Sequence, residues 1–462
     1  MCAQFLPARE INMNIIIAGC GNVGGTLAEQ LSQEEHRITV IDTNAKIVEE
    51  ISDSFDVYGV VGTGSSINVL EEANIDDCDL FIAVTGNDEM NLLACLIAKS
   101  RGVKNLIARV GNPEYGREIG LIKSTLGLTM VINPHAASAR EMAALLNLPL
   151  ALNVDIFPKS RAEIISYKLT EQSPLNDMTM KEFGEKFHSE ILVPVVERND
   201  EVLIPGGDFK MEEGDIISVL ASIDVAHEFF KSLGFSVSGA SNAMLIGGGR
   251  TTVYLSRILM SMGVEVKIIE QDPARCEKLS DILDGATIIQ GDATDKNLLI
   301  EEGIEDVDAF IANTSFDEEN IMLALYAKEV AKCKVITKIH RTSFDKIIDS
   351  LDIGSVVYPK YIIAERILRF VRSQMQNDSG ILSLYQLNDN RVEAIEFEVP
   401  EDAKFIDKPL SEIKVKKGVI IGCVTHDNKS AIATGSTFIH AGDKIVVLTT
   451  EKGLHDVHDI AK

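Results

Sequence analysis

The residues with the clearest capacity for chemistry are three glycines near the start of the chain, Gly19, Gly21 and Gly24. They follow an apolar run and precede an amphipathic stretch, so their Gly-x-Gly-x-x-Gly spacing falls at a strand-to-helix turn. The first glycine permits the tight turn, the second lets the backbone approach a diphosphate, and the third lets the helix pack closely on the strand. The N–H groups at the start of the helix then face the phosphates. The expected phosphate-binding residues of a dinucleotide site are Gly19, Cys20, Gly21, Asn22, Val23 and Gly24.

Further candidate site residues follow at the ends of later apolar runs. Asp42 comes about 20 residues after the glycines, where a carboxylate accepts hydrogen bonds from ribose hydroxyls. A carboxylate there would repel a 2′-phosphate, which favours NAD(H) over NADP(H). Thr85 and Gly86 follow the fourth run and Arg109 ends the fifth, at the sheet edge where open α/β folds bind ligands. Arg109 would either contact phosphate oxygens or form a salt bridge at the domain edge.

The same pattern recurs in the second half of the chain with altered residues. Gly247, Gly248 and Gly249 retain the turn, and Glu270 replaces Asp42 as the ribose acceptor. Thr252 occupies the third glycine position, so we expect helix and strand to approach less closely there. Arg250, just after the turn, is placed to meet a phosphate. We therefore expect a second but different site, for a nucleotide with another number of phosphates.

The elements that must position these residues alternate between short apolar strands and longer amphipathic helices. This alternation predicts an α/β fold with two tandem Rossmann-like, doubly wound parallel-sheet domains. The predicted strands of the first domain are 14–18, 37–41, 58–61, 80–84, 105–109 and 129–132. Those of the second are 243–246, 265–269, 287–289, 309–312, 334–338 and 355–358.

Each Rossmann-like unit is followed by a segment with short β-rich runs and closely spaced turn residues. Gly214-Asp215 and Gly442-Asp443 each precede an apolar run, which predicts a hairpin strand in a small α+β subdomain. The predicted order of domains is Rossmann-like 13–135, small 150–234, Rossmann-like 242–360 and small 380–460.

One predicted helix lies outside this scheme. Residues Tyr361–Gln376 place Ile363, Ile367, Phe370 and Val371 on a single face. An apolar stripe outside a complete sheet either forms a dimer contact or packs on its own domain.

Composition narrows the classes of partner. The 44 basic and 70 acidic side chains give a net charge of −26, which argues against nucleic acid. The charge either keeps the protein in solution or suits docking on Lys/Arg-rich cytoplasmic loops of a membrane protein. Seven cysteines without a Cys-x-x-Cys spacing fit reduced thiols, and no apolar run is long enough to span a membrane. We therefore expect a soluble cytoplasmic protein.

The sequence offers little for catalysis. His135 is the histidine nearest a strand end of the first sheet, and a loop histidine is usually solvated. His455 and His458 lack further metal ligands, so we expect no metal and no catalytic residues. Asp88 and Glu89 fit ordinary helix capping. A non-enzymatic role is expected, and an NAD-dependent oxidoreductase is the alternative.

The order of these motifs resembles the RCK or KTN regulatory domains of potassium transport. The resemblance is carried by Val40-Ile41-Asp42, Val61–Ser65 and Ala83-Val84-Thr85, and again by Gly291–Asp295 and Asp317–Met322. The tandem arrangement, with a small β-rich subdomain after each unit, is similar to the TrkA family of Trk potassium uptake systems. This sequence departs from the family pattern at Gly86 and at Arg250-Thr251-Thr252.

The resemblance implies a non-catalytic regulatory subunit on the inner face of the cell membrane. Such proteins form a homotetrameric ring beneath a potassium transporter subunit of the TrkH or TrkG type. NAD(H) and adenine nucleotides such as ATP or ADP change the ring and the partner's gate. The first site would comprise Gly19 to Val23, Asp42, Thr85, Gly86 and Arg109, and the second Gly247 to Gly249 and Glu270. A regulator of a potassium efflux channel is a further alternative.

Overall fold

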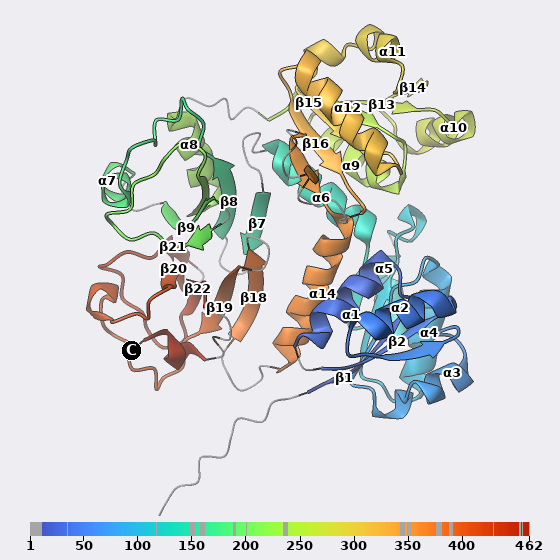
Figure 1. Cartoon of the computed structure of the whole chain (residues 1–462), viewed down its shortest axis with the longest axis horizontal. Coiled ribbons are helices and arrows are strands. Elements are labelled where there is room, and N and C mark those ends of the chain that lie inside the picture. The colour runs from blue at the N-terminus through green and yellow to red at the C-terminus, as the bar shows by residue number, and fades with distance from the viewer. Residues whose placement is uncertain are drawn as a thin grey trace, which may run out of the picture.

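The computed structural model of the chain has four folded units, which Figure 1 shows as two larger α/β bodies beside two smaller ones. The residues that the structure describes are 12–34, 36–116, 118–147, 153–157, 162–187, 191–199, 201–233, 239–341, 347–348, 351, 353–375, 381–387, 391–427, 429–451, 454 and 456–461.

The first α/β unit is a parallel sheet with the strand order β3-β2-β1-β4-β5-β6. Residues along β1 alternate between two hydrophobic cores, with Ile15 and Ile17 on one face and Ile16 and Ala18 on the other. Helices therefore cover both faces, as predicted. The strands are β1 (Asn14–Ala18), β2 (Arg37–Asp42), β3 (Tyr58–Val61), β4 (Leu80–Ala83), β5 (Asn105–Arg109) and β6 (Met130–Ile132). The helices are α1 (Asn22–Ser32), α2 (Ala45–Ser54), α3 (Ile67–Glu72), η1 (Ile75–Asp77), α4 (Asp88–Ser100), η2 (Pro113–Gly116) and α5 (Ile119–Leu126).

The second α/β unit repeats this sheet with the order β14-β13-β12-β15-β16-β17. The predicted fold class is thus confirmed for both units. The strands are β12 (Asn242–Ile246), β13 (Glu265–Glu270), β14 (Thr287–Gln290), β15 (Ala309–Ala312), β16 (Lys334–Lys338) and β17 (Ser355–Val357). The helices are α9 (Arg250–Ser261), α10 (Pro273–Ile282), α11 (Lys296–Glu301), η3 (Ile304–Asp306) and α12 (Asp317–Val330).

Each small unit is an antiparallel sheet, with the orders β10-β9-β11-β8-β7 and β18-β19-β22-β20-β21. The first comprises β7 (Asn153–Phe157), β8 (Ala162–Lys168), α7 (Met180–Lys186), β9 (Leu192–Arg198), β10 (Glu201–Leu203), β11 (Ile216–Ala221) and α8 (Ile223–Ser232). The second comprises β18 (Ile381–Leu387), β19 (Val392–Glu398), η4 (Leu410–Glu412), β20 (Val419–His426), β21 (Lys429–Ile432), β22 (Lys444–Thr449) and η5 (Val457–Ile460). The strands after the two Gly-Asp pairs, β11 and β22, are central strands. The hairpin prediction is wrong for both: β11 pairs with β8 and β9 and not with the preceding β10, and β22 pairs with β19 and β20 and not with the preceding β21.

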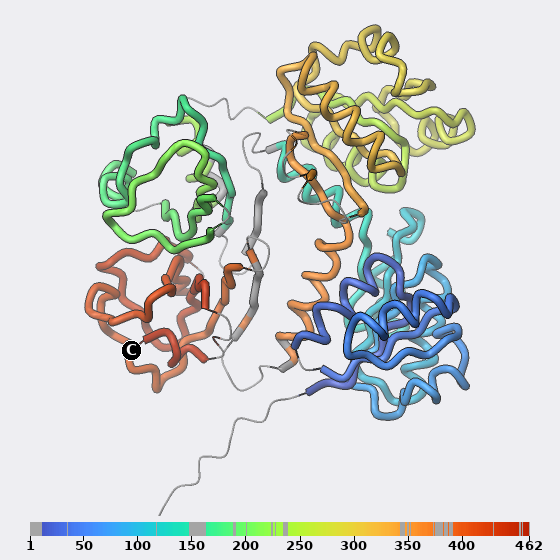
Figure 2. Tube along the Cα trace, in the orientation of Figure 1, coloured from blue at the N-terminus to red at the C-terminus, as the bar shows by residue number. Residues whose placement is uncertain are grey.

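Two long helices exchange places between the α/β units, as Figures 1 and 2 show. α6 (Pro134–Asn147) continues from the first unit and packs on α9 of the second. α14 (Pro359–Met375) continues from the second unit, and its Ile363, Ile367 and Val371 enter the core of the first. Arg372 of α14 also pairs with Glu34, at the end of α1. Both expectations for this helix are therefore wrong, since it packs on the other copy within the same chain.

Candidate functional site

The first glycine loop has the geometry that its spacing predicts. Gly19 has φ +104°, and a Cβ added to Gly24 would lie 1.8 Å from the Gly19 carbonyl oxygen, so neither position admits a side chain without rearrangement. Asp42 holds the loop, because Oδ2 accepts from the Cys20 N–H at 2.7 Å and Oδ1 from the Asn44 N–H at 2.9 Å. Each carboxylate oxygen has a second lone pair, so the group can still accept from a ribose hydroxyl.

Behind this loop, Asn91 of α4 joins the ends of β4 and β5. Its Oδ1 accepts from the Thr85 N–H at 2.9 Å, and its Nδ2 donates to the Arg109 carbonyl at 2.9 Å. Arg109 Nη1 donates to the Thr85 carbonyl at 3.1 Å, while Arg109 Nε is buried without a hydrogen-bond partner among the described residues. The Arg109 side chain therefore lies beside the cavity and keeps one N–H donor, Nε, that is not used in a hydrogen bond. The sequence analysis missed Asn91, although the asparagine recurs in the second copy as Asn320.

Asp88 does not cap its own helix, which corrects the sequence-based expectation for this residue. Its Oδ2 accepts from the Gly111 and Asn112 N–H groups at 3.0 and 2.8 Å, so it fixes the loop after β5. The N-cap of α4 is instead Asn87, whose side chain accepts from the Met90 N–H.

The second glycine loop has a similar backbone, but different side chains form the hydrogen bonds that hold it. Gly247 has φ +90°, and Glu270 accepts from the N–H groups of Gly248 at 2.7 Å and Asp272 at 2.9 Å. Thr252 donates its hydroxyl to the Gly247 carbonyl and accepts from Asn313 Nδ2 at 2.8 Å. The second loop therefore accommodates a hydrogen-bonded side chain at the position where the first loop admits only Gly24.

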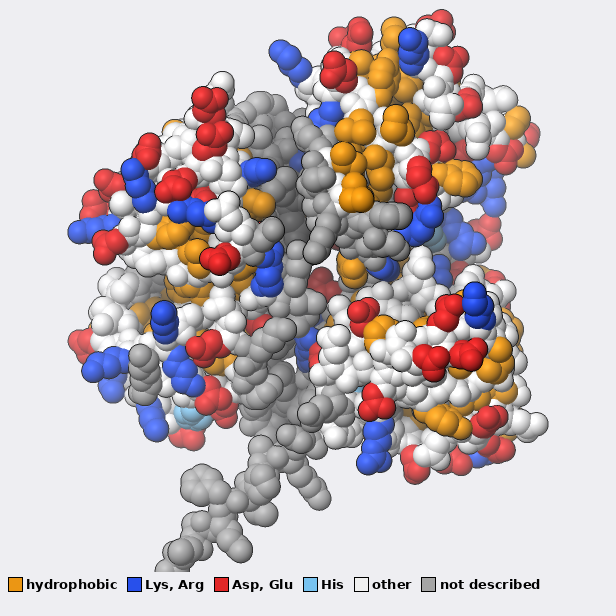
Figure 3. Space-filling model, viewed as in Figure 1, with side chains coloured by type: hydrophobic (Ala, Val, Ile, Leu, Met, Phe, Trp, Pro, Cys, Tyr) orange, Lys and Arg blue, Asp and Glu red, His pale blue; other side chains and the backbone are white. Residues whose placement is uncertain are grey.

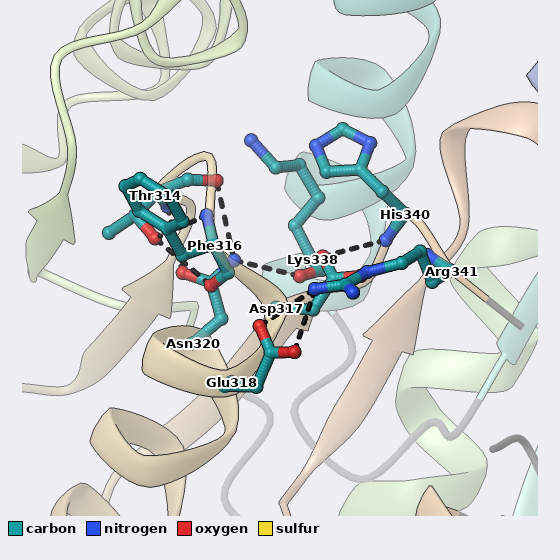
Figure 4. Close-up of polar contacts among 8 residues, drawn as sticks. All are labelled: Thr314, Phe316, Asp317, Glu318, Asn320, Lys338, His340 and Arg341. Carbon is teal, nitrogen blue, oxygen red and sulfur yellow. Dashed lines mark hydrogen bonds and ion pairs between the residues drawn. The ribbon is translucent and has the colours of Figure 1, made fainter. Parts of the chain in front are cut away.

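Figure 4 shows the rest of this second arrangement around α12 and β16. Asn320 accepts from the Thr314 N–H and donates to the Lys338 carbonyl, as Asn91 does in the first copy. Asp317 accepts from the N–H groups of His340 and Arg341 at 2.9 and 2.8 Å. The side chains of Lys338 and His340 extend to the same side of the strand end (Figure 4).

Both loops open into one cavity of about 1010 Å³ between the two α/β units. Of the residues predicted from the sequence, the structure brings together Gly19, Gly21, Asn22, Val23, Asp42, Thr85, Gly86, Arg109, Gly247, Gly248, Gly249 and Glu270. Cys20 and Gly24 are buried behind the loop and do not line the cavity. The assignment of all these residues to nucleotide binding stays a prediction.

The two copies touch at the centre of the cavity. His135, at the start of α6, places Nδ1 3.1 Å from Thr251 Oγ1, and Asn133 Nδ2 donates to the Tyr254 hydroxyl at 2.9 Å. A Cβ added to Gly111 would lie 3.1 Å from the His135 ring and 3.7 Å from Arg250 Nη1. Arg250 thus extends from the second copy to the first. The expectation of a solvated His135 is wrong, because the crossing of α6 onto α9 partly buries it and places it beside Thr251.

Several basic side chains surround His135. Burial, together with Arg109, Arg250, Lys338 and His340, lowers the pKa of His135 to about 4. Burial lowers the pKa of Lys338 to about 8, against the opposing effect of Asp317. Burial also lowers the pKa values of His340 and Arg109. The cavity lining holds five Lys or Arg and five Asp or Glu side chains, and the cations at the strand ends, Arg109 and Lys338, suit the phosphates of an anionic ligand.

The residues present fit a dinucleotide. Gly21 and Gly86 leave open space where a side chain would otherwise stand, and the helix N-termini and cations suit phosphates. Among the described residues, no cluster of three or more His, Cys, Asp or Glu side chains could hold a metal. His455 lies outside the described residues. His458 belongs to the second small unit, where its Nε2 lies 3.5 Å from Asp402 Oδ1.

A doubled Rossmann-like fold, with facing glycine loops and a small antiparallel sheet after each unit, defines a tandem nucleotide-binding class of protein. The chain belongs to the TrkA family. The TrkA-N domain model matches residues 15–134 and 243–359, and the TrkA-C domain model matches 164–234 and 394–462.

Relatives match over almost the whole chain. The Trk system potassium uptake protein TrkA of Vibrio alginolyticus is 31% identical over 96% of this chain and 98% of its own length. The Trk system potassium uptake protein TrkA homolog of Archaeoglobus fulgidus is 30% identical over 97% of this chain and 100% of its own. These matches confirm the predicted resemblance.

Solved structures share the fold at low sequence identity. The GsuK RCK domain has a TM-score of 0.62 and 16% identity, covering 96% of this chain and 94% of that one. The GsuK channel bound to NAD has a TM-score of 0.61 and 16% identity, covering 97% and 79%. No helix among the described residues of our chain is long and apolar enough to cross a membrane.

Proposed function

We propose that this chain is a regulatory subunit of a Trk-type potassium uptake system that binds NAD(H) at the first site. An adenine nucleotide such as ATP or ADP occupies the second site. The chain assembles into a homotetrameric ring beneath a membrane potassium transporter of the TrkH or TrkG type. The nucleotides change the shape of the ring, and with it the partner's gate.

The observation that carries this proposal is the single cavity shared by two glycine loops. A ligand bound there contacts both α/β units, so it favours the relative orientation in which both sets of contacts form. A binding preference of about 1–3 kcal/mol between two shapes shifts their equilibrium about 5- to 150-fold. Several such sites in a ring would act on one gate.

Assembly is supported by matching apolar faces on the two copies. On α4, Leu93 and Leu96 are each 45% exposed, and on α12 Met322 is 66% exposed. Figure 3 shows orange side chains gathered over α12. Exposed apolar patches of this kind mark protein–protein contacts. Because the two faces occupy equivalent positions, they suit a repeated contact between chains, which forms a ring when the rotation between neighbours closes.

Docking beneath the membrane is supported by charge. The net charge of −26 complements the Lys/Arg-rich cytoplasmic loops of membrane proteins. The names of the relatives point to potassium uptake rather than efflux. We therefore place the protein at the inner face of the cell membrane.

The test has two parts that distinguish the alternatives. Calorimetry on the full chain should give saturable heats with NADH and with ADP, and co-purification should recover a membrane potassium transporter. NADH should not be consumed in the presence of cell metabolites, whereas an oxidoreductase would consume it. Absence of binding at millimolar nucleotide, or a monomer at all concentrations, would contradict the proposal. Recovery of an efflux channel would replace uptake with efflux.

A further inference from the structure

The two sites differ in the cation that lies beside the glycine loop. Arg109 ends β5 and Lys338 ends β16, and both line the cavity. Arg109 donates to the Thr85 carbonyl, and Lys338 Nζ donates to the Asn313 carbonyl at 3.1 Å. An arginine stays protonated at any pH at which the protein is folded, but a buried amine can lose its proton. A carbonyl accepts a hydrogen bond from a charged or a neutral amine, so this contact does not force Lys338 to stay charged.

From this placement we infer that the second site is proton-coupled. An anionic nucleotide that binds there, as the proposed function requires, does so together with a proton taken up from the buffer by the Lys338 amine. The first site, with Arg109 in the equivalent position, binds without one. Phosphate charge beside the amine favours its protonated form, and the new N–H group becomes a donor to a phosphate oxygen.

The surroundings of Lys338 favour the loss of its proton at alkaline pH. The side chain is 8% exposed, and burial holds its pKa at about 8. The carboxylate that opposes this lowering, Asp317, already accepts two backbone N–H groups. The other charged or titratable side chains that line the cavity from the second copy or its crossing helices are His340 after β16, His135 on α6, Arg250 on α9, Lys360 on α14, Glu319 on α12, Glu270 at the end of β13, Asp272 before α10, Arg275 on α10 and Asp292 after β14. Arg109 and Asp42 line the same cavity from the first copy.

The histidines are separable from Lys338 by pH. Burial and neighbouring cations lower the pKa values of His135 and His340, so both imidazoles are neutral at pH 8.5 without a ligand. Their proton uptake, if phosphate charge induces it, falls in the acidic range. Measurement at pH 8.5 therefore isolates Lys338.

The experiment is calorimetry of the full chain with NADH and with ADP at pH 8.5, in Tris and in bicine. These buffers have different ionisation enthalpies, and the phosphates of both ligands are fully ionised at this pH. The difference in observed heat gives the number of protons exchanged. We expect net uptake of a fraction of one proton per chain when the second site fills, because burial lowers the pKa of Lys338 to about 8 and bound phosphate favours its protonated form.

Two reciprocal substitutions test the assignment. Lys338→Arg should reduce the uptake to near zero while keeping a cation, and Arg109→Lys should add uptake at the first site. Asp42→Ala, by weakening the first site, should leave the uptake in place.

Buffer-independent heats in the unaltered chain, or an undiminished uptake in Lys338→Arg, would overturn the inference while leaving nucleotide binding intact. No binding heat at all would instead contradict the proposed function. If Lys338→Arg does not fold, the uptake that Arg109→Lys adds at the first site still decides the question.

Discussion

The two candidate sites share a backbone but differ in a residue behind the glycine loop and in a cation at the cavity. In both copies a carboxylate from the second strand, Asp42 or Glu270, accepts two N–H groups and holds the glycine loop. In both copies an asparagine on the fourth helix of the unit joins two strand ends. The copies differ where Thr252 replaces Gly24 and where Lys338 replaces Arg109.

This comparison separates what shapes the site from what selects the ligand. Hydrogen bonds between carboxylates, amides and backbone are retained, because without them the loops would lose their positions. The groups that point into the cavity have diverged. The duplicated fold therefore offers two sites of different chemistry on one cavity.

The largest expected effect comes from Gly24→Ala. The new Cβ would lie 1.8 Å from the Gly19 carbonyl oxygen, so the first loop must move. We expect NADH affinity at the first site to fall at least 100-fold, or about 2.7 kcal/mol, in a calorimetric titration. Gly120→Ala on α5 is the matched control, because a Cβ there meets nothing within 4 Å. Wild-type affinity in Gly24→Ala would show that this loop does not hold the nucleotide.

The next effect compares Asp42→Ala with Glu270→Ala. Each change removes the acceptor for two backbone N–H groups and for a ribose hydroxyl. Asp42→Ala should weaken NADH binding about 10- to 100-fold, which is about 1.4–2.7 kcal/mol. Glu270→Ala should leave the first site within about threefold and weaken the second. The assignment fails if NADH affinity, measured by calorimetry, is unchanged in Asp42→Ala.

The sequence predicted the sheets well because burial on both faces leaves a strong pattern. Predicted strands such as 14–18, 58–61 and 105–109 agree with β1, β3 and β5. The glycine spacing also predicted the turn, since the backbone itself requires it at Gly19 and Gly24.

The sequence did not predict the contacts between the two copies, because these depend on which surfaces of the two α/β units meet. The apolar stripe of α14 showed that the helix is buried, but not that it packs on the first copy. The burial of His135 follows from that same exchange of helices. Nothing in the sequence singled out Lys338 and His340, which line the cavity where the two α/β units meet.

A smaller effect is expected from Tyr254→Phe, which tests whether the two sites communicate. The change removes the Asn133–Tyr254 hydrogen bond between the copies, and Tyr254 does not line the cavity. We expect each site to keep its own affinity, while the influence of ADP on NADH binding falls by up to about fivefold, or about 1 kcal/mol. Titrations of NADH with and without ADP measure this coupling. Tyr58→Phe, at an exposed tyrosine, serves as the control. Equal coupling in the two variants would show that the Asn133–Tyr254 hydrogen bond does not contribute to communication between the sites.

The smallest effect concerns the small sheets, where the copies again differ in one cation. Arg198 pairs with the buried Asp215 at 2.7 Å, and in the second copy His426 Nδ1 lies 2.6 Å from the buried Asp443. The hydrogen bond to Asp443, and then its charge, raises the pKa of His426. A raised pKa in the folded state means that this pair's stabilisation is complete below the unfolded value of about 6.5, and is lost as pH rises through the folded value.

Hydrogen exchange should therefore show protection of β20 and β22 declining slightly from pH 6 to pH 9, after correction for the intrinsic exchange rate. Protection of β11, beside the permanently charged Arg198, should stay level over the same range. His426→Arg should give the second sheet the pH-independent behaviour of the first, because a guanidinium keeps its charge. If β22 loses protection equally in His426→Arg and in the unaltered chain, the pH dependence arises from groups other than this pair.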